Sequence, residues 1–172
     1  DVAYATTRAN SAIVHAGYDP EPGTMMARLN VRGNALIEQL AQTLDVPYQK
    51  IGSFVLALQP EDQETLRALY NRGVQNGVPE LRLLSREEAL AMEPALSPDV
   101  LGALYAPSAG IVSPWELCLA LMEAAVQNGA ELRLMHEVTG VEKTEEGYAL
   151  QTPQGPVHSR FVVNAAGVDA AK

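Results

Sequence analysis

The stretch from Thr6 to Gly17 holds the residues whose types and spacing best suit ligand binding and proton transfer. Small and hydroxyl side chains crowd it, and its one histidine, His15, is followed by an alanine and a glycine. Small residues let a flat ligand approach the main chain, whose free amides can then hydrogen-bond the ligand's heteroatoms. An imidazole suits proton transfer near neutral pH. The alternative, which composition alone favours, is an ordinary Ser/Thr-rich loop.

Two further segments combine small residues with an expected strand or turn. Residues 161–163 predict a buried strand that runs into Ala165, Ala166 and Gly167, where a helix can begin close to a bound phosphate or ribose. Residues 105–114 hold two prolines and a glycine just before an expected helix. Taken alone, each segment is equally well explained as a turn with a packing role.

Helices and strands are expected to alternate around these segments. Helices are predicted over about 33–45, over about 61–76, after a capping box at Ser85 and Glu88, and from a second capping box at Ser113 to Gly129. Strands are predicted at 52–58, 81–84 and 100–106, in an alternating run at 132–138, and in a hairpin of 141–144 with 147–152. The fold class is therefore α/β or α+β.

The composition argues against several kinds of binding partner and site. The chain has 172 residues, with 12 Lys+Arg against 21 Asp+Glu and a net charge of −9. This balance argues against nucleic-acid binding, which needs clustered basic residues. One cysteine excludes an internal disulfide, and three widely spaced histidines offer no local metal site. No apolar run reaches the roughly 20 residues that a membrane-spanning helix needs.

Together and in this order, the three segments resemble the flavin-dependent oxidoreductases of the D-amino-acid oxidase superfamily. The run Asn10-Ser11-Ala12-Ile13-Val14-His15-Ala16-Gly17, followed by Pro22-Gly23-Thr24 and Arg32-Gly33-Asn34, is similar to the stretch in which the family's chain passes the isoalloxazine ring. Residues 106–114 resemble the family's P-x-x-G-x-x-x-P segment, and 164–167 resemble its returning strand beside FAD. The resemblance covers nearly the whole chain and is nearest to FAD-dependent glycerol-3-phosphate dehydrogenases of the anaerobic type and L-2-hydroxyglutarate oxidases.

This resemblance implies oxidation of glycerol 3-phosphate to dihydroxyacetone phosphate, with hydride transfer to FAD and onward transfer of electrons to a quinone or another acceptor. It places His15 beside the ring, as the base for the hydroxyl proton of a small anionic substrate. Arg8, Arg28 and Arg32 are candidates for the anionic group, with solvated surface arginines as the alternative. Cofactor contacts are implied for ten residues: Thr6, Thr7, Asn10, Ser11, Ala16, Gly17, Val138, Ala165, Ala166 and Gly167.

Other functions stay open at this point. A 2-hydroxyacid oxidase acting on L-2-hydroxyglutarate is the nearest alternative, because a carboxylate and a phosphate both call for Arg or Lys. An amine-oxidising relative is a further enzyme alternative. From another class, a non-catalytic interaction module would keep the fold without the flavin.

The resemblance also implies an architecture. Residues 24–135 would form a substrate domain, a mixed β-sheet with helices on one face, between a flavin-facing loop at 1–23 and returning strands of a Rossmann-like FAD domain at 136–172. The family's Gly-x-Gly-x-x-Gly is absent, since none of the 13 glycines stands two positions from another. We therefore expect a piece of a larger protein, cytoplasmic or attached to a membrane surface, that binds FAD weakly or not at all by itself.

Overall fold

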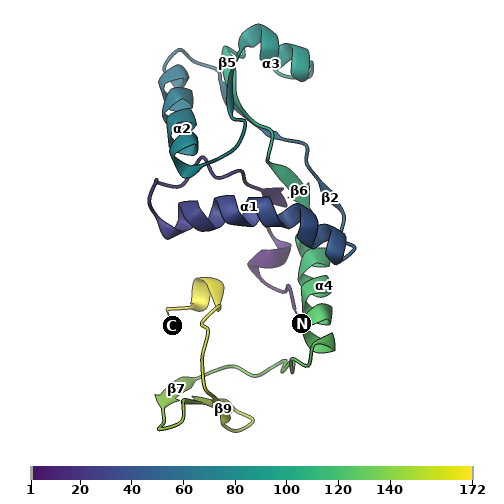
Figure 1. Cartoon of the computed structure of the whole chain (residues 1–172), viewed down its shortest axis with the longest axis vertical. Coiled ribbons are helices and arrows are strands. Elements are labelled where there is room, and N and C mark those ends of the chain that lie inside the picture. Colours follow the sequence, from purple (N-terminus) through teal and green to yellow (C-terminus); the bar gives the residue numbers. More distant parts are fainter. Residues whose placement is uncertain (1, 172) are drawn as a thin grey trace. The chain divides into compact units, whose positions relative to one another are not determined.

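The computed structural model describes residues 2–171, and the chain divides between Gly129 and Ala130 into two compact units. The first unit contains η1 (Thr6–Arg8), β1 (Ile13–Val14), α1 (Met25–Thr43), β2 (Tyr48–Gln49), β3 (Ser53–Ala57), α2 (Asp62–Asn76), β4 (Arg82–Ser85), α3 (Arg86–Met92), β5 (Gly102–Ala106), β6 (Gly110–Val112) and α4 (Pro114–Gln127) (Figure 1). The second contains β7 (Gly140–Lys143), β8 (Tyr148–Gln151), β9 (Val157–Ser159) and η2 (Gly167–Asp169).

The mixed α/β (α+β) class is confirmed, but the strands are arranged differently from the expectation. In place of one mixed sheet, the described residues form three three-stranded sheets, in the orders β1-β6-β2, β3-β5-β4 and β7-β8-β9. Every pairing among them is antiparallel. Short connections join the strands of the β7-β8-β9 sheet, whereas β1 and β2 pair with β6, and β3 with β5, across long stretches of sequence that include helices.

The β3-β5-β4 sheet is covered on both faces, which corrects the expectation of helices on one face. Successive side chains of a strand point to opposite faces. On one face, Ala57 and Leu104 pack with Leu66 of α2, and Leu104 is fully buried. On the other face, Ala103 packs with Ala89 of α3.

The β1-β6-β2 sheet has a covered inner face and an exposed outer face. Its inner side chains include Val14 and Val112, which pack with Ala41 of α1 and with Leu117 of α4. The outer face carries Ile13 and Ile111, which are 45% and 36% exposed.

Helix α1 begins at Met25, eight residues before the predicted start at 33. Thr24 is its N-cap, because the Thr24 hydroxyl accepts a hydrogen bond from the backbone N–H of Ala27 at 3.2 Å. Gly33 lies within the helix and weakens the apolar pattern there, although the capped first turns still form.

The capped starts of two other helices were predicted correctly. Ser85 and Glu88 form the predicted reciprocal capping box at α3. At α4 the structure gives one of the two bonds of the predicted box, in which the Ser113 hydroxyl accepts from the backbone N–H of Glu116. Pro114 occupies the first turn of α4, where its missing N–H costs nothing. Gly77 ends α2 in the left-handed conformation.

Two predicted strands are wrong. Residues 132–138 and 161–163 are irregular, and within residues 2–171 no strand pairs with them. Backbone N–H and C=O groups form a strand only where a neighbour supplies their partners, which an alternating apolar pattern alone does not guarantee. Phe161 is 82% exposed and is therefore not part of a buried strand. The predicted hairpin at 141–152 is confirmed as β7 and β8.

Candidate functional site

His15 lies directly after β1, at the point where this strand leaves its partner. The register pairs Ile13 with Ile111 and Val14 with Gly110, so the two predicted segments, 6–17 and 105–114, lie side by side. The alternation of the extended chain continues beyond the strand: Val14 and Ala16 face inward, while Ile13 and His15 are exposed. This alternation puts exposed His15 on the same face as Ile13 and Ile111, two residues along the chain from Ile13.

Two asparagines of α1 bind the main chain at His15. The side-chain amide of Asn30 donates to the His15 carbonyl at 2.8 Å. The amide of Asn34, one turn later, donates to the same carbonyl at 3.2 Å and to the Ser108 carbonyl at 2.8 Å. One side chain thus joins the loop at His15 to the turn before β6.

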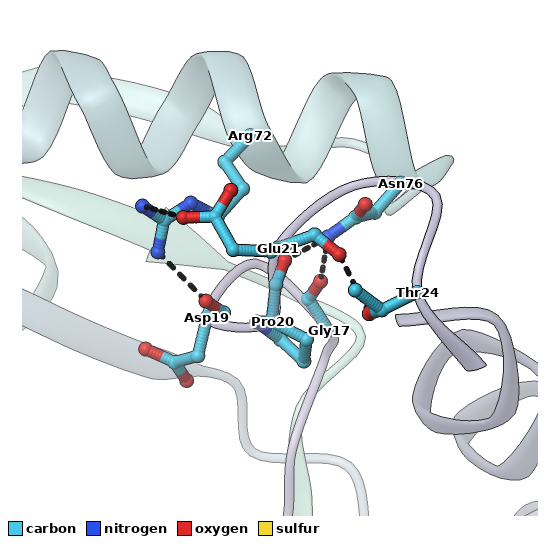
Figure 2. Close-up of polar contacts among 7 residues, drawn as sticks. All are labelled: Gly17, Asp19, Pro20, Glu21, Thr24, Arg72 and Asn76. Carbon is cyan, nitrogen blue, oxygen red and sulfur yellow. Dashed lines mark hydrogen bonds and ion pairs between the residues drawn. The ribbon is translucent and has the colours of Figure 1, made fainter. Parts of the chain in front are cut away.

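The far end of the same loop is held by α2 (Figure 2). The amide of Asn76 donates to the carbonyls of Gly17 and Pro20, at 2.9 and 2.8 Å. The guanidinium of Arg72 donates to the Asp19 carbonyl at 2.8 Å and forms an ion pair with Glu21 at 3.0 Å. Carbonyl groups along the loop that follows β1 are therefore bonded to side chains from both helices.

The small residues of the loop face the interior of the first unit. Ala16 is 1% exposed and belongs to the core around Leu104. Gly17 has a φ of +111°, and a β-carbon there would lie 2.6 Å from Cγ2 of Val31. Any contact that Ala16 and Gly17 make with a ligand would therefore involve the main chain and not a side chain.

The polar candidates nearer the N-terminus are all exposed. Thr6 and Thr7 lie in η1, and the Asn10 amide donates to their carbonyls at 3.1 and 2.8 Å. Asn10 also accepts from the backbone N–H of Ala12 at 2.8 Å, so its side chain orders its own turn. Ser11 is the exposed residue between them.

The structure does not bring the three candidate arginines together. Arg8 lies in η1 with its guanidinium 4.8 Å from the centre of the Tyr4 ring. Arg28 and Arg32 are exposed and one turn apart on α1. At about 3.6 residues per turn, they project from the side of α1 opposite Asn30 and Asn34, and thus away from the His15 carbonyl.

In the second unit, the remaining candidates gather around a hollow of about 430 Å³. Val138, Ala165 and Ala166 line it, together with Asn164. Gly167 begins η2 next to it, with a φ of +61°. Residues nearly thirty positions apart in the sequence thus meet at one concave surface, which Leu150 and Val163 also line.

Burial affects one ionisable group beside the loop. Burial raises the pKa of the Tyr18 phenol, a hydrogen bond with Ser53 opposes this rise, and the charge of Asp19 adds to it. The phenol therefore stays neutral at physiological pH and adds no negative charge to the loop.

Sequence reasoning missed the residues that position this site. The outward pair Ile13 and Ile111 had a weak signal, because Ile13 and His15 are two residues apart in an extended segment. The spacing of Asn30 and Asn34 was a clearer sign of a shared role, since side chains four positions apart in a helix lie on the same face. The partners of Asn76, Gly17 and Pro20, lie more than fifty residues away and left no local signal.

Comparisons with known proteins agree with the resemblance. The family described as "FAD dependent oxidoreductase" matches residues 1–172. The chain is 47% identical over 172 residues to a glycerol 3-phosphate dehydrogenase of Caloramator mitchellensis, covering 100% of the chain and 36% of that protein. It is 31% identical over 180 residues to the mitochondrial L-2-hydroxyglutarate dehydrogenase of Mus musculus, covering 98% of the chain and 38% of that protein.

A solved structure is similar as well. An L-alpha-glycerophosphate oxidase of Mycoplasma pneumoniae with FAD bound superposes with a TM-score of 0.79 at 30% identity, covering 89% of this chain and 41% of that one. The chain therefore spans well under half the length of the proteins it matches. Among the described helices, none is both long and apolar enough to cross a bilayer.

Proposed function

The chain belongs to the FAD-dependent oxidoreductase family, and we propose that it is the segment of a dehydrogenase that oxidises glycerol 3-phosphate to dihydroxyacetone phosphate. The similarity that supports this substrate most strongly is the 47% identity, along the whole chain, to a glycerol 3-phosphate dehydrogenase. Because the chain spans about a third of that relative's length, we propose the activity for the full-length protein that contains it.

The residues present fit a flavin. A planar ring needs a flat apolar surface next to main chain, and Ile13 and Ile111 provide one beside the exposed His15. In the second unit, Val138, Ala165 and Ala166 line a hollow together with Leu150 and Val163, and these side chains give it an apolar lining that could receive part of a cofactor. When bound, the flavin supplies the acceptor for the two electrons that leave the substrate as a hydride.

The residues of this chain hold the substrate and move its proton. As the C2–H bond of glycerol 3-phosphate breaks, the C2 hydroxyl loses a proton and becomes the ketone. We assign that proton to the imidazole of His15, an exposed residue. The main-chain carbonyl of His15 accepts hydrogen bonds from Asn30 and Asn34. The apolar neighbours Ile13 and Ile111 would exclude water from the reacting carbon.

The substrate's phosphate needs a cation, and Arg8 is the candidate that this geometry favours. It belongs to the segment leading to β1, whereas Arg28 and Arg32 project from the opposite side of α1. We propose Arg8 as the phosphate ligand and the other two as surface residues. The electrons would then pass to a quinone or another acceptor, at a cytoplasmic site or at the surface of a membrane.

The second candidate function is oxidation of L-2-hydroxyglutarate, favoured by the 31% identity to a dehydrogenase of that substrate. Both reactions remove a hydride from a carbon that carries a hydroxyl group, and both substrates are anionic. They differ in the anionic group and in its distance from the reacting carbon.

The test is turnover by the full-length protein. We expect a yellow protein that reduces an artificial electron acceptor with glycerol 3-phosphate, and does so much more slowly with L-2-hydroxyglutarate. The reverse preference would support the second function. A colourless protein that is inactive with both would favour a non-catalytic module and contradict the proposal.

A further inference from the structure

We propose that Asn34 is a positioning residue that fixes the imidazole of His15 by bridging two segments of main chain. The inference rests on the proposed function, in which His15 takes the substrate's proton. It adds a residue of α1 that touches neither substrate nor flavin in the proposed reaction.

The protein bonds to the His15 carbonyl come from side chains of α1. Strand β1 is two residues long and pairs with β6 only through Ile13 and Val14. Next to Gly110 of β6, the Ala109 carbonyl accepts from the backbone N–H of Gly52 at 2.9 Å, so that carbonyl is bonded to the chain after β2. The bonds to the His15 carbonyl that the structure describes come from Asn30 and Asn34. The two bonds to the His15 carbonyl are exposed, whereas the Asn34 bond to the Ser108 carbonyl is partly buried. An unpaired carbonyl is costly where water is excluded, so the bridge stabilises the loop chiefly through its Ser108 end.

Of the two, only Asn34 joins separate segments. Asn30 binds the His15 carbonyl alone, whereas Asn34 also binds the carbonyl of Ser108, which is buried. A primary amide has two N–H groups, so one side chain can donate to both carbonyls at once. The bridge continues the contact between β1 and β6 past the end of their ladder.

A fixed carbonyl limits the direction in which the His15 side chain leaves the main chain. The peptide unit is planar, so two donors on the His15 oxygen set the orientation of the whole unit between His15 and Ala16. Ala16 is anchored in the core on the other side. The imidazole then retains only its own side-chain torsions, which limits the set of positions its base nitrogen can reach on the outer face. A displacement of about 1 Å at such a group can cost about 100-fold in rate.

The experiment compares single and double variants of the full-length flavoprotein. Asn34→Ala removes the donors, and the isosteric Asn34→Asp also places a carboxylate against two carbonyl oxygens. The matched control is Asp62→Ala, which removes two side-chain bonds to the backbone, those to the N–H groups of Leu58 and Gln59. Asp62 begins α2, at the opposite end of that helix from Asn76.

We expect Asn34→Ala to lower kcat by about 10- to 100-fold, with a nearly unchanged KM and the flavin still bound. Asn34→Asp should lower kcat at least as much, and Asp62→Ala should leave kcat unchanged. In a His15→Gln background, the further loss from Asn34→Ala should nearly vanish, because Asn34 acts through His15. A merely structural role would give the same loss in both backgrounds.

The outcomes separate the inference from the proposed function. If His15→Gln abolishes turnover while Asn34→Ala retains it, or if the two losses are additive, the inference is overturned and the role of His15 stands. If His15→Gln alone leaves kcat unchanged, the proposed role of His15 fails and the inference falls with it. If Asn34→Ala does not fold, the same comparison is made with Asn34→Ser, which keeps one donor and should lose less.

Discussion

The two units of the chain hold their candidate cofactor contacts in different ways. In the first unit, α1 directs asparagine side chains onto the His15 carbonyl, and α2 directs an arginine and an asparagine onto carbonyls that follow it. In the second, Val138 and Ala165 line an open hollow, and Phe161, Val163 and Val168 are more than 80% exposed. Ala149 is the only buried residue in the described part of that unit.

This difference separates a preorganised surface from an adaptable one. A loop whose backbone polar groups are already paired loses little further entropy when a ligand binds. Exposed apolar side chains instead gain most of their stabilisation from whatever covers them. We therefore expect the loop near His15 to keep its conformation without flavin, and the second unit to become more ordered on binding flavin.

The strongest test of the contrast is a large-to-small substitution in each unit. Leu104→Ala should lower the free energy of unfolding by about 2–5 kcal/mol, because Leu104 is fully buried in the core that supports Ala16. Val163→Ala should change it by less than about 0.5 kcal/mol, since Val163 is 86% exposed. Urea unfolding of the chain measures both, and equal losses would contradict the contrast.

A substitution at Gly17 tests the packing of the loop against α1. Gly17→Ala should destabilise the chain by about 1–3 kcal/mol more than Gly23→Ala. Both glycines have positive φ, but an added β-carbon meets Val31 at Gly17 and meets nothing within 4 Å at Gly23. Thermal unfolding measures the difference. Adding Val31→Ala to Gly17→Ala should recover part of the loss, and no recovery would contradict the packing explanation.

Removing the α2 anchor should have a smaller effect. Asn76→Ala deletes bonds to Gly17 and Pro20 and should cost about 1–3 kcal/mol, the range for a part-buried carbonyl left unpaired. Hydrogen exchange should show faster opening across residues 15–21 and no change in the second unit. Equal acceleration in both units would mean that the bonds stabilise the whole chain and not this loop.

Removing a carboxylate whose pKa is lowered should have the smallest effect, seen in how stability depends on pH. Backbone N–H groups of Leu58 and Gln59 lower the pKa of Asp62, so its contribution is present above the ordinary value of about 4 and is lost as the pH falls through the lowered value. A hydrogen bond and the charge of Arg133 lower the pKa of Glu131 in the second unit. Asp62→Asn should therefore weaken the dependence of stability on pH below about 4. Glu131→Gln should change it less, because its partner is an exposed arginine two residues away.

The sequence predicted local features well and non-local contacts poorly. Ser85, Ser113 and Gly77 mark helix ends through bonds within a few residues, so these ends were predicted within one or two positions. The start of α1 was missed because Gly33 interrupts the apolar pattern while Thr24 still caps the helix. The strands predicted at 132–138 and 161–163 failed because a strand needs a partner, which no local pattern reveals.

The site shows the same limit. The resemblance located His15 and the two small-residue segments, and the structure places Ile13 and Ile111 beside that histidine. The bridge from Asn34 to Ser108 spans 74 positions and depends on how β1, β6 and α1 pack together. Such contacts follow from the fold, so residue types and spacing alone did not predict them.

In the proposed reaction, His15 of this chain supplies the base for flavin-dependent oxidation of glycerol 3-phosphate. The most direct measurement mixes the oxidised full-length flavoprotein with glycerol 3-phosphate in the absence of oxygen and follows the visible flavin absorbance. We predict rapid bleaching in the unaltered protein, and bleaching at least about 100-fold slower in His15→Gln with its flavin retained. No bleaching by glycerol 3-phosphate, or equal rates in the two proteins, would contradict the claim.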